Sequence, residues 1–496
     1  MLLREGETYE ALKSRMTSED RLMKSKQTLQ EEMPRLSHIE EHMDFINPWK
    51  CKSSDEDIKR LYMFHERIGE GFCGVVYRAT PYSSPKTSYA VKVLEKKKMN
   101  KLAWDYLQRE MELLRDVECS YIVQLFEVYE DEQKIYMLTE LCEGGDLVGL
   151  VEQVRGLDEE VAKKFFWQAA TAAHYLHHAG IVHRDLKLDN FLLTNPSPHN
   201  ADLKLIDFGF ATFYREKRLY STIGTPYYVA PEVLAKNYSV ECDVWSLGVV
   251  LYMMVFATPP FKGKNNAQIF EQIRTKEINF SNDRSRRASQ GLKDLLSGLL
   301  CKNPQKRMTI SEALQSKWFH SAIREFTSVW KPHLTSQLLK DLKNTPNRTN
   351  FQKEVSRLII KLFMNRPEVT ILTHVFVLMD FQNTGLLGVT CLCEAFSDLN
   401  VPLTETEADQ LITKTSLRDH KFMTYLDFIV ATISKSYFTE DEYLMKAFNK
   451  ITGESTNVIS FSNIRQCFER FGYVLEDEAI NSFMAEFGIK PNGAIT

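Results

Sequence analysis

The sequence contains no apolar run long enough for a membrane-spanning helix, which needs about 20 consecutive apolar residues. Its first residues, MLLREGETYE, lack the charged and then apolar pattern of a secretory signal. N-myristoylation requires a glycine directly after the initiator methionine, and Leu2 stands there. We therefore expect a cytoplasmic protein with no membrane anchor.

Cysteine pairs of the zinc-binding kind are also missing. The nine cysteines are scattered, and the closest two, Cys391 and Cys393, form a CxC without a second pair. We expect free thiols in a reducing compartment. A net charge of -4 gives no basic excess, so nucleic acid is not an expected partner.

The length of 496 residues exceeds one typical domain, since domains average about 150 residues. Residues 1–60 are rich in Glu, Lys, Met and Ser and show no wide apolar stripe, so we expect an N-terminal extension that is helical or disordered. From Tyr62 the pattern changes to alternating apolar residues, which indicates the start of a folded domain.

Residues 183–190, HRDLKLDN, together with DFG at 207–209, carry polar groups suited to phosphoryl transfer. Asp185 can take a hydroxyl proton, and Lys187 can offset phosphate charge. Asn190 and Asp207 offer the hard oxygen ligands that Mg²⁺ prefers. An isolated HRD could equally be a surface turn with an ion pair, but further motifs follow in the matching order.

A glycine-rich hairpin, GEGFCG, precedes this segment. Gly69, Gly71 and Gly74 have no Cβ and can lie over phosphates, while Ile68 and Val76 flank them and Val76 offers an apolar face to a nucleobase. A dinucleotide-binding motif is the alternative, but its glycines lead from a strand into a helix. Here they lead into another strand, VVYRA.

Further ATP contacts are expected from the next strands and helix. Lys92, in the strand SYAVKVLE, is placed for the α- and β-phosphates, and Glu110 in QREMELLRDV is its expected partner, with Glu112 as the competitor. The strand KIYMLTE leads into a connection from Glu140 to Cys142 whose backbone can pair with adenine, with Thr139 at the back of the pocket.

These motifs together resemble a eukaryotic protein kinase over residues 62–320. The resemblance implies a bilobal α+β fold, ATP and Mg²⁺ as cofactors, and an ion pair between Glu232 and Arg307. Lys187 in the catalytic loop and the GTPYY segment resemble the serine/threonine branch. The expected domain spans residues 61–320.

The chain after the kinase segment contains two helices broken near Pro346, expected as a junction over 321–365, and then three helix-loop-helix units with the start of a fourth. This order resembles the calcium-dependent protein kinases of plants and protists. The resemblance implies an all-α, calmodulin-like domain with EF-hand-like lobes at 366–434 and 435–496, the second incomplete at the C-terminus. The junction helix is its expected intramolecular partner.

The calcium chemistry of that family is largely missing. An EF-hand loop needs oxygen ligands at positions 1, 3, 5, 9 and 12 and glycine at position 6. The first loop keeps Asp380, Thr384 and Gly385 at positions 1, 5 and 6, but Gln382 occupies position 3 and Cys391 position 12. Asp380 and Thr384 are therefore at most a weak calcium site.

The remaining loops depart further from the pattern. The second begins at Ser416, has Arg418 at position 3 and Lys421 at position 6, and keeps only Asp427 at position 12. The remaining positions of interest are Thr452, Glu454, Asn457 and Asn463 in the third loop and Gly493 at position 6 of the fourth, which reaches Thr496 before position 12. Apolar faces let the helices pack without metal. We therefore expect a constitutive brace or a docking lobe that holds the junction helix, with a bound partner or phosphorylation as the switch.

Regulatory and substrate residues follow from the kinase resemblance. Arg184 is a cation that phosphate at Ser221 would neutralise, with Thr222 as the close alternative. Asp146 is positioned to select an arginine three residues before the target hydroxyl, or simply to begin a helix. Met253 replaces a second acidic selector, so protein substrates with one basic residue upstream are expected.

The sequence thus predicts a serine/threonine protein kinase. The alternative is a weakly active kinase that acts mainly as an interaction scaffold. RRAS at 286–289 resembles a basophilic phosphorylation site, but Ser289 is expected to N-cap the helix after it.

Overall fold

The computed structural model describes residues 58–70, 74–82, 87–214, 218–221, 224–280, 288–319, 328–348, 350–361, 367–416 and 421–433, with shorter stretches after residue 440 that include 458–470 and 494–495. Contacts divide the chain into two compact units. One comprises residues 1–45, 102–113 and 142–325, and the other comprises 46–101, 114–141 and 326–496. Each unit is described by itself.

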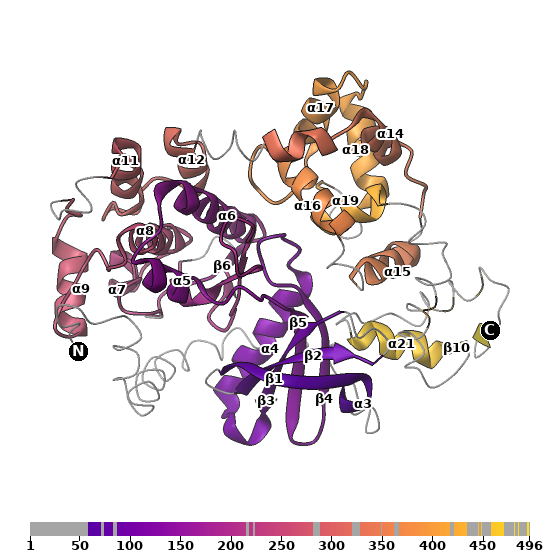
Figure 1. Ribbon diagram of the computed structural model, residues 1–496, viewed down its shortest axis with the longest axis horizontal. Coiled ribbons are helices and arrows are strands. Elements are labelled where there is room, and N and C mark those ends of the chain that lie inside the picture. The colour runs from indigo at the N-terminus through magenta and orange to yellow at the C-terminus, as the bar shows by residue number, and fades with distance from the viewer. Residues whose placement is uncertain are drawn as a thin grey trace. The chain divides into compact units, whose positions relative to one another are not determined.

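The first unit is mainly helical. Its long helix α8 (Glu241–Phe256) is buried along almost all of its length, as the apolar sequence DVWSLGVVLYMM predicts for a helix inside a large helical lobe. Around it lie α5, α6, α9, α11 and α12 (Figure 1). The helical elements are α4 (Lys101–Asp116, of which residues 102–113 belong here), α5 (Leu147–Val154), α6 (Glu159–His178), η3 (Leu188–Asn190), α7 (Pro231–Leu234), α8, α9 (Asn266–Thr275), α11 (Gln290–Leu299), α12 (Ile310–Leu314) and η4 (Lys317–Phe319).

Two short antiparallel ribbons hold the loops that matter for chemistry. Strand β6 (Ile181–Val182) pairs with β9 (Thr212–Phe213), and β7 (Phe191–Leu193) pairs with β8 (Leu203–Leu205). The catalytic loop runs between β6 and β7, and DFG runs between β8 and β9. Both segments are therefore anchored at each end by backbone pairing.

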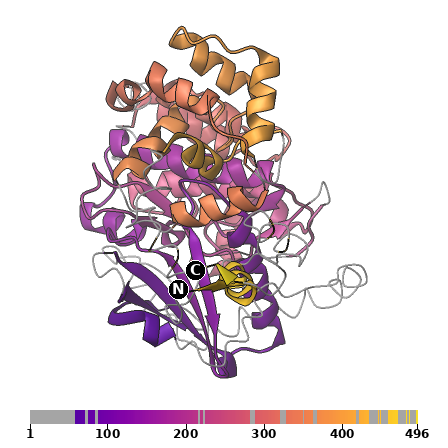
Figure 2. The same ribbon diagram turned by 90° about the vertical axis from the view of Figure 1, so that its right-hand side faces the viewer.

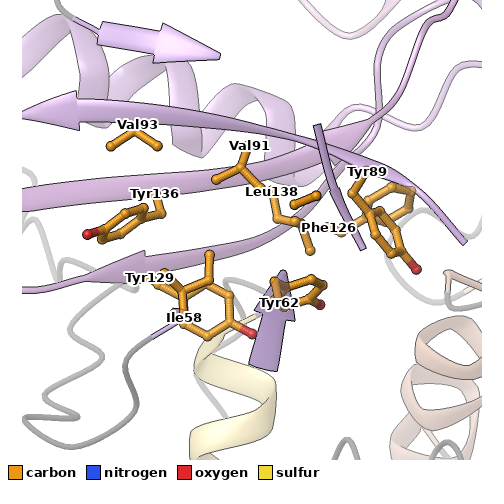
Figure 3. Close-up of a cluster of buried hydrophobic side chains, with 10 residues drawn as sticks. Ile58, Tyr62, Tyr89, Val91, Val93, Phe126, Tyr129, Tyr136 and Leu138 are labelled. Carbon is orange, nitrogen blue, oxygen red and sulfur yellow. The ribbon is translucent and has the colours of Figure 1, made fainter. Parts of the chain in front are cut away.

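The second unit begins with a five-stranded antiparallel sheet in the order β1-β2-β3-β5-β4. Its strands are β1 (Tyr62–Glu70), β2 (Gly74–Pro81), β3 (Tyr89–Glu95), β4 (Leu125–Glu130) and β5 (Lys134–Glu140), preceded by α3 (Ile58–Leu61). A cluster of buried side chains covers one face of the sheet (Figure 3). Tyr62 packs edge-on against Tyr89 and Tyr129, so the strand start predicted at Tyr62 coincides with the aromatic centre of this core.

The same unit contains the helices of the second half of the chain. The break expected near Pro346 separates α14 (Ser336–Lys343) from α15 (Asn350–Lys361). The remaining helical elements are η5 (Lys331–His333), α16 (Pro367–Met379), α17 (Val389–Asp398), α18 (Glu405–Thr415), α19 (Tyr425–Thr432) and α21 (Phe461–Arg470). In both views α16 to α19 lie together as one helical group (Figures 1 and 2).

Backbone pairing confirms the loop register read from the sequence. Leu387 and Met423, at position 8 of the first and second loops, form an antiparallel bridge. Strand β10 (Ile459–Ser460) pairs with β11 (Ala494–Ile495) so that Ile459 faces Ile495, which are position 8 of the third and fourth loops. The loops therefore pair two by two.

None of the described helices is long and apolar enough to cross a membrane. The described cysteines are free, as expected. Residues 1–57, which include most of the proposed N-terminal extension, lie outside the described residues.

Candidate functional site: the catalytic loop and its supports

The catalytic loop brings Asp185, Lys187 and Asn190 together. Asp185 is only 3% exposed, and its Oδ2 contacts the Lys187 ammonium. The Thr225 hydroxyl donates to Asp185 Oδ1 at 2.9 Å, and Asn190 Nδ2 donates to the Asp185 backbone carbonyl at 2.8 Å. The carboxylate is thereby fixed by a cation and a hydroxyl. Thr225, in the GTPYY segment, was not among the predicted site residues.

The Lys187 ammonium stays charged in this buried place. Burial alone would lower its pKa, but the Asp185 and Asp207 carboxylates outweigh that effect and raise the pKa above its ordinary value. Lys187 is therefore a permanent positive charge beside Asp185 at neutral pH.

Asp243 fixes the backbone of the catalytic loop by hydrogen bonds. It was not among the residues predicted from the sequence. Its Oδ1 accepts the backbone N–H of Arg184 at 2.8 Å, and its Oδ2 accepts the N–H of His183 at 2.9 Å. His177 Nε2 lies 2.9 Å from the same Oδ2. Burial would raise the pKa of Asp243, but these hydrogen bonds and the histidines lower it, so the carboxylate stays ionised. The sequence signal was an acidic residue, Asp243, at the start of the apolar run of α8.

The DFG segment presents Asp207 to solvent and buries its neighbour. Asp207 is exposed, has a φ of 66° and accepts the Gly209 N–H at 3.2 Å. Phe208 is fully buried with its ring centroid 5.1 Å from that of His183. The Ile206 N–H donates to the Asn190 carbonyl at 2.8 Å, which joins the two loops.

These residues fit a magnesium site. The Asn190 amide uses Nδ2 as a donor to Asp185, so its oxygen is the group left to act as an acceptor or ligand. The exposed Asp207 carboxylate supplies the second kind of hard oxygen donor.

Glu110 is buried on α4 in the same unit. On the same helix, the ring centroid of Tyr106 lies 5.9 Å from that of Phe210, the residue directly after DFG.

The predicted nucleotide contacts of the second unit lie on β1, β2, β3 and β5. Gly69 pairs with Val76, and Lys92 lies between Val76 and Met137 in the ladder. A side chain at Gly74 would place its Cβ 2.1 Å from the Val93 carbonyl oxygen, so close strand pairing alone requires glycine there.

The surroundings of the other predicted nucleotide contacts do not test their roles in binding ATP. Ile68 is largely exposed, Thr139 pairs with Ala90, and the Glu140 N–H donates to the Gln124 carbonyl at 3.0 Å. Cys142 is half-buried in the first unit. Gly71 and Thr222 lie outside the described residues.

The activation segment places Ser221 beside Arg184. An Arg184 Nη1 donates to Ser221 Oγ at 3.2 Å, while Nε donates to the Phe210 carbonyl at 2.7 Å. Ser221 Oγ also lies 3.3 Å from the Tyr238 hydroxyl. The guanidinium thus connects the catalytic loop, the residue after DFG and the predicted phosphorylation position.

Three further sequence interpretations concern local structure. Asp146 N-caps α5 by accepting the Gly149 N–H at 2.7 Å, and Ser289 N-caps α11. The ion pair between Glu232 and Arg307 is present and buried, with distances of 2.5 and 2.9 Å. A charged pair excluded from water in this way is costly to break.

The first EF-hand-like loop is closed on itself. Asp380 is buried and accepts the N–H groups of Thr384 at 3.1 Å and Gly385 at 2.5 Å. Burial raises its pKa to about 7, and burial likewise raises the pKa of the Cys391 thiol to about 11. Among the described residues, no group of three or more His, Cys, Asp or Glu side chains gathers as a metal site.

Comparison with known proteins agrees with this geometry. Residues 62–319 match the protein kinase domain model. The chain is 30% identical over 442 residues to calcium-dependent protein kinase 19 of Arabidopsis thaliana, covering 89% of this chain and 79% of that protein. It is 32% identical over 408 residues to calcium-dependent protein kinase 2 of Zea mays, covering 82% and 78%. The chain therefore belongs to the calcium-dependent protein kinase family of protein kinases.

Proposed function

We propose that the chain transfers the γ-phosphoryl group of ATP to serine and threonine hydroxyls of protein substrates. The observation that carries the proposal is the fixed carboxylate of Asp185, held between the Lys187 ammonium and the Thr225 hydroxyl. A carboxylate in this state can orient a substrate hydroxyl and accept its proton as the oxygen attacks phosphorus. Magnesium-bound ATP supplies the electrophilic phosphoryl group.

The other residues of the loop serve charge and position. Lys187 offsets the charge that develops on the transferring group, because nearby carboxylates keep it protonated. Asn190 and Asp207 would hold Mg²⁺ through their oxygens. Asp243 acts through the backbone of His183 and Arg184, so it positions the loop without touching the substrate. The roles of Lys92 and Glu110 in holding ATP stay predictions from the sequence.

A transfer assay with radiolabelled ATP tests this function. Peptides with serine, threonine or tyrosine acceptors are compared for the wild type, Asp185→Asn and Asp294→Asn, which neutralises a carboxylate on α11. We expect labelling of the serine and threonine peptides and a loss of about 10²-fold or more in Asp185→Asn only. Equal transfer by wild type and Asp185→Asn would support the scaffold alternative.

We further propose that Asp146 selects an arginine three residues before the acceptor. The cap hydrogen bond of α5 uses Oδ1 of Asp146, so Oδ2 can pair with a substrate cation. Asp146→Asn is a sharp test because asparagine caps helices about as well as aspartate. On peptide arrays, this variant should lose the preference for arginine at that position while the start of α5 is preserved. An unchanged arginine preference would assign Asp146 to capping alone.

Regulation is proposed to depend little on calcium. Each of the two relatives carries calcium dependence in its name. In this chain the first loop satisfies Asp380 internally and presents the neutral thiol of Cys391 where a bidentate carboxylate is needed. Lys421 occupies position 6 of the second loop, and a cation there repels Ca²⁺. A ligand with little differential affinity for two states cannot shift them.

A further inference from the structure

Helix α15 directs two cations at the two ends of the second loop. Lys353 and Arg357 are one helical turn apart, and both are buried. Lys353 Nζ donates to the backbone carbonyl of Ser416, position 1 of the loop, at 2.8 Å. Arg357 Nη1 donates to Oδ1 of Asp427, position 12, at 2.6 Å. The bridge of Met423 at position 8 fixes this numbering.

In a calcium-binding loop, the carboxylate at position 12 is the bidentate ligand of the metal. Here that carboxylate, on Asp427, is 3% exposed and forms an ion pair with the guanidinium of Arg357 from a neighbouring helix. Asp427 also closes the capping box of α19 with Thr424. The loop therefore has a positive partner within the chain for the one carboxylate that it keeps at a calcium-ligand position.

Arg357 also contacts the kinase segment between α4 and β4. Its Nη2 forms an ion pair with Oε1 of Glu118, which is 2% exposed. The Thr424 hydroxyl donates to the other oxygen of Glu118 at 2.7 Å. Glu118 is thus held by α15 and by the N-terminus of α19 at the same time.

The contact between Arg357 and Glu118 lies in the interior of this unit. Tyr425, next to Thr424, is buried, and its pKa is raised by burial and by the nearby Glu140 and Cys119 of the kinase segment. Lys353 and Arg357 supply two positive charges, and Glu118 and Asp427 supply two negative charges. Buried charges are tolerated when they are paired in this way, and removal of one partner leaves the others uncompensated.

We infer that Lys353 and Arg357 take over the role of calcium in the second loop and fasten the first EF-hand-like lobe to the Glu118 segment. Both cations are side chains of the protein itself, so neither addition nor removal of Ca²⁺ breaks these contacts. This deepens the proposed function by naming what holds the C-terminal lobe. It makes α15 a fixed clamp between the lobe and the kinase sheet.

Hydrogen exchange of α15 in the full chain, measured by mass spectrometry in Ca²⁺ and in EGTA, tests the clamp. Arg357→Met keeps most of the aliphatic volume and removes the charge. Gln352→Met, at an exposed position of the same helix, is the matched control. We expect α15 to exchange roughly 100-fold faster in Arg357→Met, because two buried carboxylates lose their cation. Gln352→Met should match the wild type, and Ca²⁺ should change neither.

A double variant distinguishes the loss of a specific ion pair from a general destabilisation of α15. Glu118→Gln alone removes one partner of Arg357 and should speed exchange. In the Arg357→Met background the same change removes an uncompensated buried charge, so it should restore part of the protection. If Arg357→Met does not fold, Arg357→Gln, which also removes the positive charge, replaces it in the same comparison.

Three results would overturn the inference. These are wild-type exchange of α15 in Arg357→Met, additive effects of the two substitutions, and a change of α15 exchange in the wild type on adding Ca²⁺. Exchange is measured without substrate or ATP, so a failure of the proposed kinase activity would be seen separately in the transfer assay.

Discussion

At the scale of single residues, buried carboxylates decide the shape of the catalytic loop. Asp243 accepts two backbone N–H groups from consecutive loop residues and contacts His177. An amide at this position has one acceptor oxygen and would present its NH₂ group to donors. We expect Asp243→Asn to reduce kcat about 10²-fold and the free energy of unfolding by about 3 kcal/mol. Steady-state kinetics and urea denaturation measure both, and unchanged kcat would exclude a positioning role.

Ser221 is the second residue-scale test. Phosphate on Ser221 would add about -2 charge next to the Arg184 guanidinium, which already donates to its hydroxyl, and would order the activation segment. We expect Ser221→Ala to lower turnover of the phosphorylated enzyme about tenfold. Thr222→Ala and the double variant are measured beside it, since the neighbouring hydroxyl is the alternative acceptor. Full turnover in all three variants would remove this switch.

At the scale of elements, the first EF-hand-like loop should show a pH-dependent stability. The pKa of Asp380 is raised from 3.8 to about 7 by burial, so the fold favours the protonated form. The resulting stabilisation is fully present below pH 3.8 and is lost as pH rises through 7. The full loss is on the order of 4 kcal/mol in the free energy of opening α16 and α17.

The matching variant is Asp380→Asn, which keeps a neutral oxygen acceptor. Exchange of α16 and α17 is compared at about pH 5 and about pH 8 after correction for intrinsic rates. The wild type should lose protection at the higher pH, and Asp380→Asn should lose much less. Identical profiles for the two proteins would show that the Asp380 carboxylate is not the group responsible.

Elements with local signals could be predicted from the residues themselves, whereas the long-range ion pair between Glu232 and Arg307 was expected only from the family resemblance. The helix break near Pro346 and the cap by Ser289 follow from residues close together in the chain. The partners of Asp243 and Arg357 come from distant segments, and no local pattern predicts which donor or cation pairs with which carboxylate. The residues predicted as catalytic could be named because their motifs are contiguous in the sequence.

At the scale of the whole molecule, the chain combines an intact set of kinase residues with EF-hand-like units whose charge balance has changed. In the second loop, Arg357 and Lys353 provide the positive charge that the loop no longer takes from a metal. A fixed intramolecular cation cannot respond to calcium concentration. We therefore expect regulation to act through groups such as Ser221, which can change charge by modification.

The most direct test is phosphoryl transfer by the full chain in saturating Ca²⁺ and in EGTA, with Asp185→Asn as the control. We expect transfer that depends on Asp185 and rates in the two buffers that agree within about twofold, because neither the first nor the second loop offers calcium a strong differential affinity. Micromolar Ca²⁺ that activates the wild type many-fold, with transfer still dependent on Asp185, would show that regulation of this chain does depend on calcium.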